Sequence, residues 1–145
     1  KLMNTNQYDI RFHHIGYACN NIAASKKFFL PFLQDDSEYL YEDIEQNVKV
    51  LFLHMIGNYK MELLEVLDKN RYCPIKKYID KNKSGIHHIC YEANIFEKTI
   101  INLKKNNFRL ISKTNNGFEG RNISFFIPKN EPNGPLIEIV SKKEC

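Results

Sequence analysis

The chain has 145 residues, of which 43% are hydrophobic and 26% charged, and its formal net charge is +4. This length and composition predict an ordinary soluble globular protein with one core, or two small units that share a core. No apolar run approaches the roughly 20 residues needed to cross a bilayer, and the first residues lack the apolar core of a signal peptide, so we do not expect export. We therefore expect a cytoplasmic protein with no membrane partner. The modest, dispersed charge does not indicate a nucleic-acid partner.

The cysteines are widely spaced and form no CxxC pair: Cys19, Cys73, Cys90 and Cys145. This spacing excludes a zinc finger and favours reduced thiols over disulfides. Lys1 and Leu2, which precede Met3, are expected to be foreign to the natural chain.

The first half of the chain has the pattern of a strand, a helix and three further strands. The expected elements are a strand at Phe12–Cys19, a helix at Ile22–Leu30, and strands at Ser37–Tyr41, Val48–Met55 and Lys60–Val66. Asn20 or Asn21 can cap the helix, and Pro31 favours its end. Gly57-Asn58 predicts a hairpin turn.

The second half repeats this β-α-β-β-β order after a linker, in which Pro74 is expected to open a short helix through Lys81. The expected elements are a strand at Ile86–Ala93, a helix at Ile95–Asn106 capped by Asn94, and strands at Phe108–Lys113, Asn122–Ile127 and Leu136–Val140. Self-similarity of this kind indicates an internal duplication.

The dipeptide His13-His14 returns 74 residues later as His87-His88, and the last strand of each half carries a carboxylate, Glu62 or Glu138. Two halves thus offer two imidazoles and two carboxylates, a set that suits a metal ion. Successive strand residues face opposite sides, so only one histidine of each pair can face a shared site, and alternation leaves open which one. By the same rule, Glu65 faces away from Glu62. The alternative is a set of hydrogen-bonded structural histidines without a metal.

Four segments resemble the vicinal-oxygen-chelate superfamily, and within it methylmalonyl-CoA epimerases and neighbouring glyoxalase-like proteins: His14–Cys19, Lys60–Leu64, Gly85–Glu92 and Leu136–Ile139. The resemblance spans about residues 12–141. It implies an α+β fold of two βαβββ modules that form a curved mixed sheet, a cup or half-barrel, around a metal site. It also implies a homodimer.

The resemblance assigns the metal ligands to the second histidine of each pair and to the two strand carboxylates: His14, Glu62, His88 and Glu138. The predicted organisation is an N-terminal extension at 1–11, a first module at 12–66, a linker with a short helix at 67–84, and a second module at 85–145, within one structural domain.

A ligand set of this kind suits a divalent ion such as cobalt, nickel, manganese or zinc, and leaves positions for two substrate oxygens. The natural chemistry is abstraction of a proton next to a thioester or carbonyl, with stabilisation of the resulting enolate. Some epimerases carry a glutamate on the strand that aligns with Val48–Met55, and here that position is assigned to Val50. Glu138 and Glu62 are therefore the candidate catalytic carboxylates.

Three further residues are candidates for substrate binding. Arg121 can meet an anionic group, with a solvated surface charge as its alternative. Phe125 is one of two adjacent phenylalanines, one on each face, and could line the cup. His54 lies on an expected strand, with a surface or edge role as its alternative.

These residues predict a metal-dependent epimerase that acts on an acyl thioester. One alternative is a glyoxalase I-like lyase that acts on a hemithioacetal, although the chain has Phe28-Phe29-Leu30-Pro31 and Glu131-Pro132-Asn133-Gly134 where glyoxalase motifs would stand. Another is a non-catalytic small-molecule-binding protein of the same fold. An extradiol dioxygenase is disfavoured because its two histidines and one glutamate leave Glu62 without a role.

Overall fold

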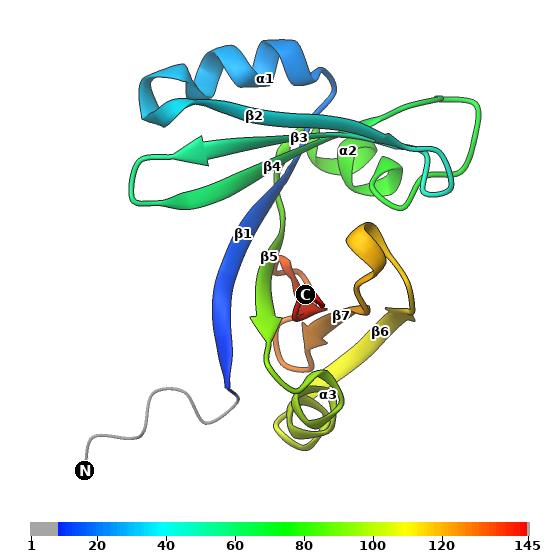
Figure 1. Ribbon diagram of the computed structural model, residues 1–145. Helices are drawn as coiled ribbons and strands as arrows, with labels where there is room; N and C mark the ends of the chain where they lie inside the picture. Colours follow the sequence, from blue (N-terminus) through cyan, green and yellow to red (C-terminus); the bar gives the residue numbers. More distant parts are fainter. Residues whose placement is uncertain (1–8, 145) are drawn as a thin grey trace. The chain divides into compact units, whose positions relative to one another are not determined.

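The computed structural model describes residues 9–144, in which the β-α-β-β-β order occurs twice (Figure 1). The first half consists of β1 (Ile10–Ala18), α1 (Ile22–Phe29), a 3-10 helix (Leu30–Phe32), β2 (Leu33–Asp43), β3 (Val48–Met55) and β4 (Tyr59–Val66). After α2 (Lys76–Asn82), the second half consists of β5 (Gly85–Ala93), α3 (Phe96–Lys105), β6 (Phe108–Thr114), a 3-10 turn (Phe118–Gly120), β7 (Ile123–Pro128) and β8 (Leu136–Ser141). The predicted α+β class and the two βαβββ modules are confirmed.

The strand order is β2-β3-β4-β1 in the first half and β5-β8-β7-β6 in the second. In each half the first strand lies parallel to the last one, and the remaining pairs are antiparallel. The strand that begins each module is therefore the direct neighbour of the strand that ends it. This topology places the histidine-bearing strand beside the glutamate-bearing strand.

The described residues divide into two compact units, one of residues 14–87 (the N-unit) and one of residues 9–13 and 88–144 (the C-unit). The boundaries fall between His13 and His14 and between His87 and His88, so β1 and β5 each contribute residues to both units. The linker helix α2 belongs to the N-unit. His14 and Glu62 therefore lie in one unit and His88 and Glu138 in the other.

The N-unit has apolar clusters on both faces of its strands. Helix α1 covers one face, as Figure 1 shows, with Ile22 and Phe29 packed against residues of β3 and β4. Asn21 caps this helix as predicted, because its Oδ1 accepts a hydrogen bond of 2.9 Å from Ala24 N. On the other face, α2 and the preceding loop pack Ile75 and Ile79 against β3 and β4.

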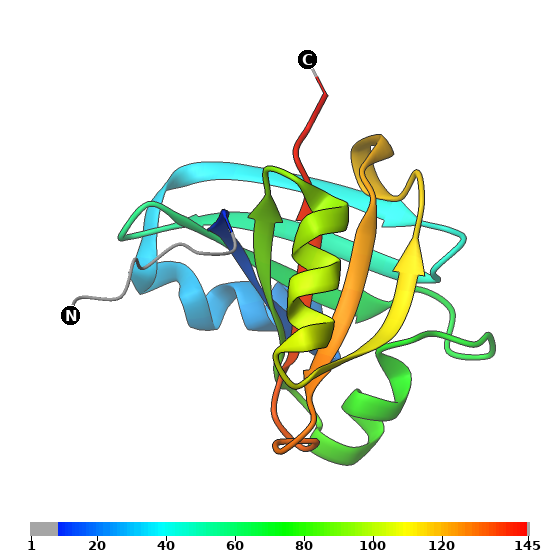
Figure 2. The ribbon, with the colours of Figure 1, turned by 90° about the horizontal axis from the view of Figure 1, so that it is seen from below.

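The C-unit has one core, in which α3 packs on the strands (Figure 2). Phe96, Ile100 and Leu103 of α3 contact Phe126 and Ile139 of the sheet. The helical spacing of the first three side chains explains why this face of α3 is buried.

The predicted cap at Asn94 is wrong. The N-cap position of α3 is Ile95, which makes no capping hydrogen bond through its side chain. Asn94 instead donates a side-chain hydrogen bond of 2.7 Å to Asp9 Oδ1, and its backbone N–H binds Asp9 O. The side chain of Asn94 is therefore used to bind a residue 85 positions away in the sequence, and it does not cap α3.

The second strand is also longer than predicted. β2 runs from Leu33 to Asp43 instead of Ser37–Tyr41, with a shift of its register against β3 between Leu33 and Glu38. Most of its side chains are exposed, so the strand lacks the alternation of buried and exposed residues by which strands are recognised.

None of the helices within residues 9–144 is long and apolar enough to cross a membrane. Cys19, Cys73 and Cys90 are free and buried, and burial raises the pKa of the Cys19 and Cys73 thiols. A raised pKa keeps both thiols protonated and poorly nucleophilic. Cys145 lies outside the described residues.

The turn before β3 is held by one fully buried side chain, that of Asn47. Its Nδ2 donates to the carbonyl oxygens of Asp68, Arg71 and Tyr72, and its Oδ1 accepts from Asp68 N at 2.8 Å. Its φ of 58° lies in the left-handed region, which asparagine tolerates better than most residues. Asn47 thus joins the β2–β3 turn to the loop that leads to α2.

We predict that Asn47→Ala lowers the free energy of unfolding by about 2–4 kcal/mol, because it leaves buried backbone groups without partners. Urea unfolding followed by circular dichroism measures the change. Asn116→Ala is the matched control, because Asn116 also has a positive φ (53°) but is exposed, and it is expected to lose about 1 kcal/mol or less. Equal losses in the two variants would show that the backbone conformation alone matters.

Candidate metal centre

In the N-unit, the parallel register of β1 and β4 brings an imidazole beside a carboxylate. Gly16 pairs with Glu62, so His14, two residues before Gly16, lies on the same face as Glu62. His14 Nε2 lies 3.5 Å from Glu62 Oε2, and the residues are 3% and 9% exposed. Glycine at position 16 adds no side chain to this crowded face.

The C-unit repeats the arrangement in β5 and β8. Cys90 pairs with Glu138, and His88 stands two residues before Cys90. His88 Nε2 lies 3.0 Å from Glu138 Oε2, and the residues are 2% and 6% exposed. Each unit thus holds one buried pair of an imidazole and a carboxylate, from equivalent strands.

Each buried imidazole also has an aromatic ring against it. Phe52 lies 5.5 Å from the His14 ring in an edge-on arrangement, and Phe125 lies 5.7 Å from the His88 ring in the same way. Both rings come from the strand antiparallel to the glutamate strand, since Phe52 pairs with Glu62 and Phe125 with Glu138. Sequence reasoning singled out Phe125 but missed Phe52. The hairpin at Gly57-Asn58 could have revealed it, because it sets the register of Phe52 against Glu62.

The first histidines of the two pairs, His13 and His87, are only half-buried. The His87 ring packs edge-on against Tyr78, with the ring centroids 5.4 Å apart. Glu65 lies on the α1 side of the sheet, as alternation predicts, where its Oε2 accepts a hydrogen bond of 2.9 Å from Ile22 N. His87 and Glu65 therefore have other contacts than the two buried pairs.

The geometry of each pair suits a metal ion. Donor atoms bound at about 2.0–2.2 Å in a tetrahedral or octahedral set lie about 3.0–3.5 Å from one another. The Nε2–Oε2 separations of 3.5 Å and 3.0 Å fall in this range. The donors are imidazole nitrogen and carboxylate oxygen, which divalent transition metals accept, and a cation would offset the cost of burying each carboxylate.

Val50 stands where some epimerases carry a glutamate, and it therefore offers no carboxylate to the face of Glu62. It is 3% exposed and packs with Val48, Leu64 and the α2 side chain Ile79. A glutamate in its place would be buried in an apolar cluster at a high cost.

His54, a candidate for substrate binding, makes two side-chain hydrogen bonds. Its Nδ1 lies 2.8 Å from Asp35 Oδ2, and its Nε2 lies 2.9 Å from Asn58 Oδ1. Hydrogen bonds to Asn58 and Asp35 raise the pKa of His54, which favours the imidazolium with both nitrogens donating. The ring would have to release one of these partners to bind a substrate atom.

Arg121, the second candidate, is not a solvated surface charge. Its side chain is 11% exposed, and its NH1 donates to Glu92 Oε2 at 2.8 Å and to Ser141 O at 3.3 Å. Glu92 is buried and also accepts hydrogen bonds from the exposed Arg11. Glu92 stands four residues after His88, on the same face of β5. No local sequence pattern indicates this cluster, because Arg11, Glu92 and Arg121 come from three separate segments.

Residues 13–125 match the family model described as the glyoxalase/bleomycin resistance protein/dioxygenase superfamily. The chain belongs to this superfamily. Over 131 residues it is 31% identical to the mitochondrial methylmalonyl-CoA epimerase of Homo sapiens. The aligned residues cover 89% of this chain and 72% of the human protein.

Solved structures share the fold of this chain. Hypothetical protein BH1468 from Bacillus halodurans C-125 is 33% identical, with a TM-score of 0.74 over 94% of this chain and 96% of that chain. A variant of the Streptomyces coelicolor methylmalonyl-CoA epimerase, in complex with 2-nitronate-propionyl-CoA, is 23% identical, with a TM-score of 0.71 over 92% and 98%. This protein therefore has the vicinal-oxygen-chelate fold that its sequence predicts.

We predict that the purified protein binds a divalent metal and that His14→Ala or His88→Ala weakens this binding at least about 100-fold. Loss of groups that merely support a ligand already costs 10–100-fold, and loss of the ligand itself costs more. Equilibrium dialysis with cobalt or zinc, followed by elemental analysis, measures the affinity. His54→Ala is the control, because His54 lies outside both pairs. Equal metal binding in all four proteins would exclude both histidines as ligands.

We also predict that Glu92 contributes a pH-dependent part of the stability. Burial by itself raises the pKa of Glu92, but Arg11 and Arg121 outweigh it and hold the pKa below the ordinary value of 4.5. A carboxyl with a lowered pKa in the folded state contributes stability above its unfolded pKa and loses it as the pH falls through the folded pKa.

The free energy of unfolding should therefore fall more steeply below about pH 4.5 in the wild type than in Glu92→Gln, which is less stable at pH 7. Urea unfolding at a series of pH values measures this. Glu97→Gln, on the exposed side of α3, should leave the acid slope unchanged. A Glu92→Gln slope equal to that of the wild type would contradict the prediction.

Proposed function

We propose that His14, Glu62, His88 and Glu138 together bind one divalent metal ion. The supporting observation is that each unit carries the same buried pair on equivalent strands, with a donor separation that suits a metal ligand set. Membership of the superfamily adds support, since metal centres built from both modules are what the resemblance implies. Cobalt, nickel, manganese and zinc all accept such nitrogen and oxygen donors.

We further propose that the protein is an epimerase that acts on an acyl thioester of the methylmalonyl-CoA type. The similarity to the human methylmalonyl-CoA epimerase extends over most of both chains. When bound, a divalent ion supplies Lewis-acid stabilisation of the negative charge that develops on a substrate oxygen. The chain's own residues must then remove and return the proton on the adjacent carbon.

Glu138 is the proposed base for this proton. Its carboxylate has two oxygens, one of which lies 3.0 Å from His88 Nε2, and it is 6% exposed, so the proton stays shielded from bulk water. Glu62 is equivalent in the other unit and is the proposed partner on the opposite side of the reacting carbon. Glu138 removes the proton from one face, and Glu62, once it carries a proton taken from solvent, donates that proton to the opposite face, which inverts the stereocentre. Glu138 then gives up its proton to solvent.

Phe52 and Phe125 keep the two imidazoles in place and limit water beside them. A low local dielectric strengthens every charge interaction with a developing enolate. The arrangement thus supports reversible proton abstraction at a carbon beside a thioester carbonyl.

We predict that the metal-loaded protein exchanges the C2 proton of methylmalonyl-CoA for deuterium in D₂O, and that Glu138→Gln lowers kcat about 100-fold or more. Glutamine keeps an oxygen at this position but cannot accept the proton. Nuclear magnetic resonance of the thioester follows the exchange. Glu131→Gln, in an exposed turn, is the control.

No exchange with any of cobalt, nickel, manganese or zinc would remove this substrate. Formation of lactoylglutathione from the glutathione hemithioacetal by the same preparation would favour the lyase alternative.

A further inference from the structure

A lysine occupies the row of residues that contains the N-unit histidine ligand. Lys60 of β4 pairs in register with His14 of β1 on one side and with His54 of β3 on the other. Residues in register on neighbouring strands point to the same face, and the strands lie about 4.8 Å apart. The three side chains therefore form one row across β3, β4 and β1, directly beside the row that contains Glu62.

The face on which Lys60 lies is set by the packing of its neighbours. Met61 and Leu63 are buried under α1, so Lys60 and Glu62 point to the opposite face. Lys60 is exposed at the hairpin end of that face, whereas Glu62 is buried. An ammonium group thus stands at the solvent-accessible edge of the N-unit pair.

The charge of Lys60 is not neutralised within the described part of the chain. The carboxylate of Asp35 on this hairpin binds His54 Nδ1 at 2.8 Å. Among residues 9–144, Lys60 has neither a hydrogen-bond nor an ion-pair partner. Lysine is also a poor strand former, and like-charged neighbours across strands are unfavourable. The positive charge of Lys60 is therefore uncompensated in this row, and a bound anion would compensate it.

We propose that Lys60 determines substrate specificity by binding the free carboxylate of a 2-carboxyacyl thioester. This inference rests on the proposed epimerase function. In such a substrate the carboxylate is attached to the reacting carbon, so it must lie close to the metal ligands, as Lys60 does. The phosphates of a CoA carrier lie a whole pantetheine arm away and do not meet this condition.

Two thioesters that differ only in this carboxylate test the proposal. Isothermal titration calorimetry measures the binding of methylmalonyl-CoA and propionyl-CoA to the metal-loaded wild type and to Lys60→Met. Methionine keeps much of the apolar stem and removes the charge. We expect about 10- to 100-fold weaker binding of methylmalonyl-CoA to the variant, the range for a charge-assisted hydrogen bond, and less than a twofold change for propionyl-CoA.

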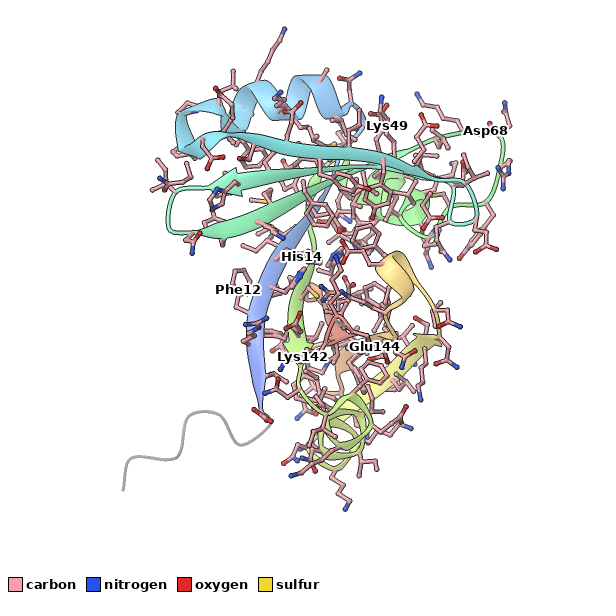
Figure 3. All side chains as sticks on the ribbon, viewed as in Figure 1. Phe12, His14, Lys49, Asp68, Lys142 and Glu144 are labelled. Atoms are coloured by element: carbon pink, nitrogen blue, oxygen red, sulfur yellow. The ribbon has the colours of Figure 1, made fainter. Side chains whose placement is uncertain are left out.

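Lys60→Arg and Lys49→Met are the control variants. Arginine retains the charge and should restore most of the preference for methylmalonyl-CoA. Lys49 lies on the same hairpin but on the α1 side of the sheet, opposite to His14, as Figure 3 shows, and its loss should change neither affinity. Thermal unfolding and elemental analysis establish that each variant is folded and holds its metal.

The outcomes separate this proposal from the epimerase function. If Lys60→Met keeps the preference for methylmalonyl-CoA, or weakens both thioesters equally, the role of Lys60 is wrong even where deuterium exchange occurs. If the wild type shows the preference and Lys60→Met loses it, but no exchange occurs, the carboxylate subsite stands and the epimerase proposal fails. A wild type without any preference overturns the subsite.

Discussion

The register between the first and last strand of each module determines the rest of the candidate site. Gly16 stands beside Glu62, and Cys90 beside Glu138. Because side chains alternate along a strand, a slip of one residue would turn each glutamate toward the face covered by α1 or α3 and separate it from its histidine. The buried clusters under α1 and α3 prevent such a slip, since it would also move their apolar side chains to the wrong face. The hydrophobic cores therefore determine which residues point to the opposite face, where the histidines and glutamates lie.

Each module covers the corresponding end of its own strand face with different side chains. The offset of 74 residues between the histidines relates Ala18 to Glu92. Ala18 is covered by apolar side chains from the loop before α2 and from α2 itself. Glu92 instead binds Arg11 and Arg121. A buried ion pair rarely adds stability over an apolar contact. Stability alone therefore does not explain why the C-unit has charged side chains where the N-unit has apolar ones. The ion pair with Glu92 explains why Arg121, although basic and adjacent to β7, is shielded from solvent.

Features that depend on local pattern could be predicted from the sequence. The bounds of β3 match the expected Val48–Met55, and the cap at Asn21 is present, because alternation and capping act within a few residues. The duplicated order of elements followed from the repeat. β2 escaped prediction beyond its central residues, since an exposed strand has no apolar face to recognise.

Features that depend on partners distant in the chain could not be predicted. Asn94 has the residue type of a cap, but Asp9 binds it. Phe52 and Lys60 acquire their importance only from the register of β3, β4 and β1, which no single segment encodes. The sequence identified the four candidate ligands through the repeat and the family resemblance, while their surroundings required the fold.

Burial of the two carboxylates is the strongest physical argument for a cation. Glu62 and Glu138 are each at least 91% buried, and an ionised carboxylate without compensation is costly in such a place. An imidazole nitrogen lies 3.5 Å from the carboxylate of Glu62 and another lies 3.0 Å from that of Glu138. A divalent ion that accepts both donors of a pair would compensate the buried carboxylate. Because each unit repeats the same buried pair, this argument does not depend on any relative.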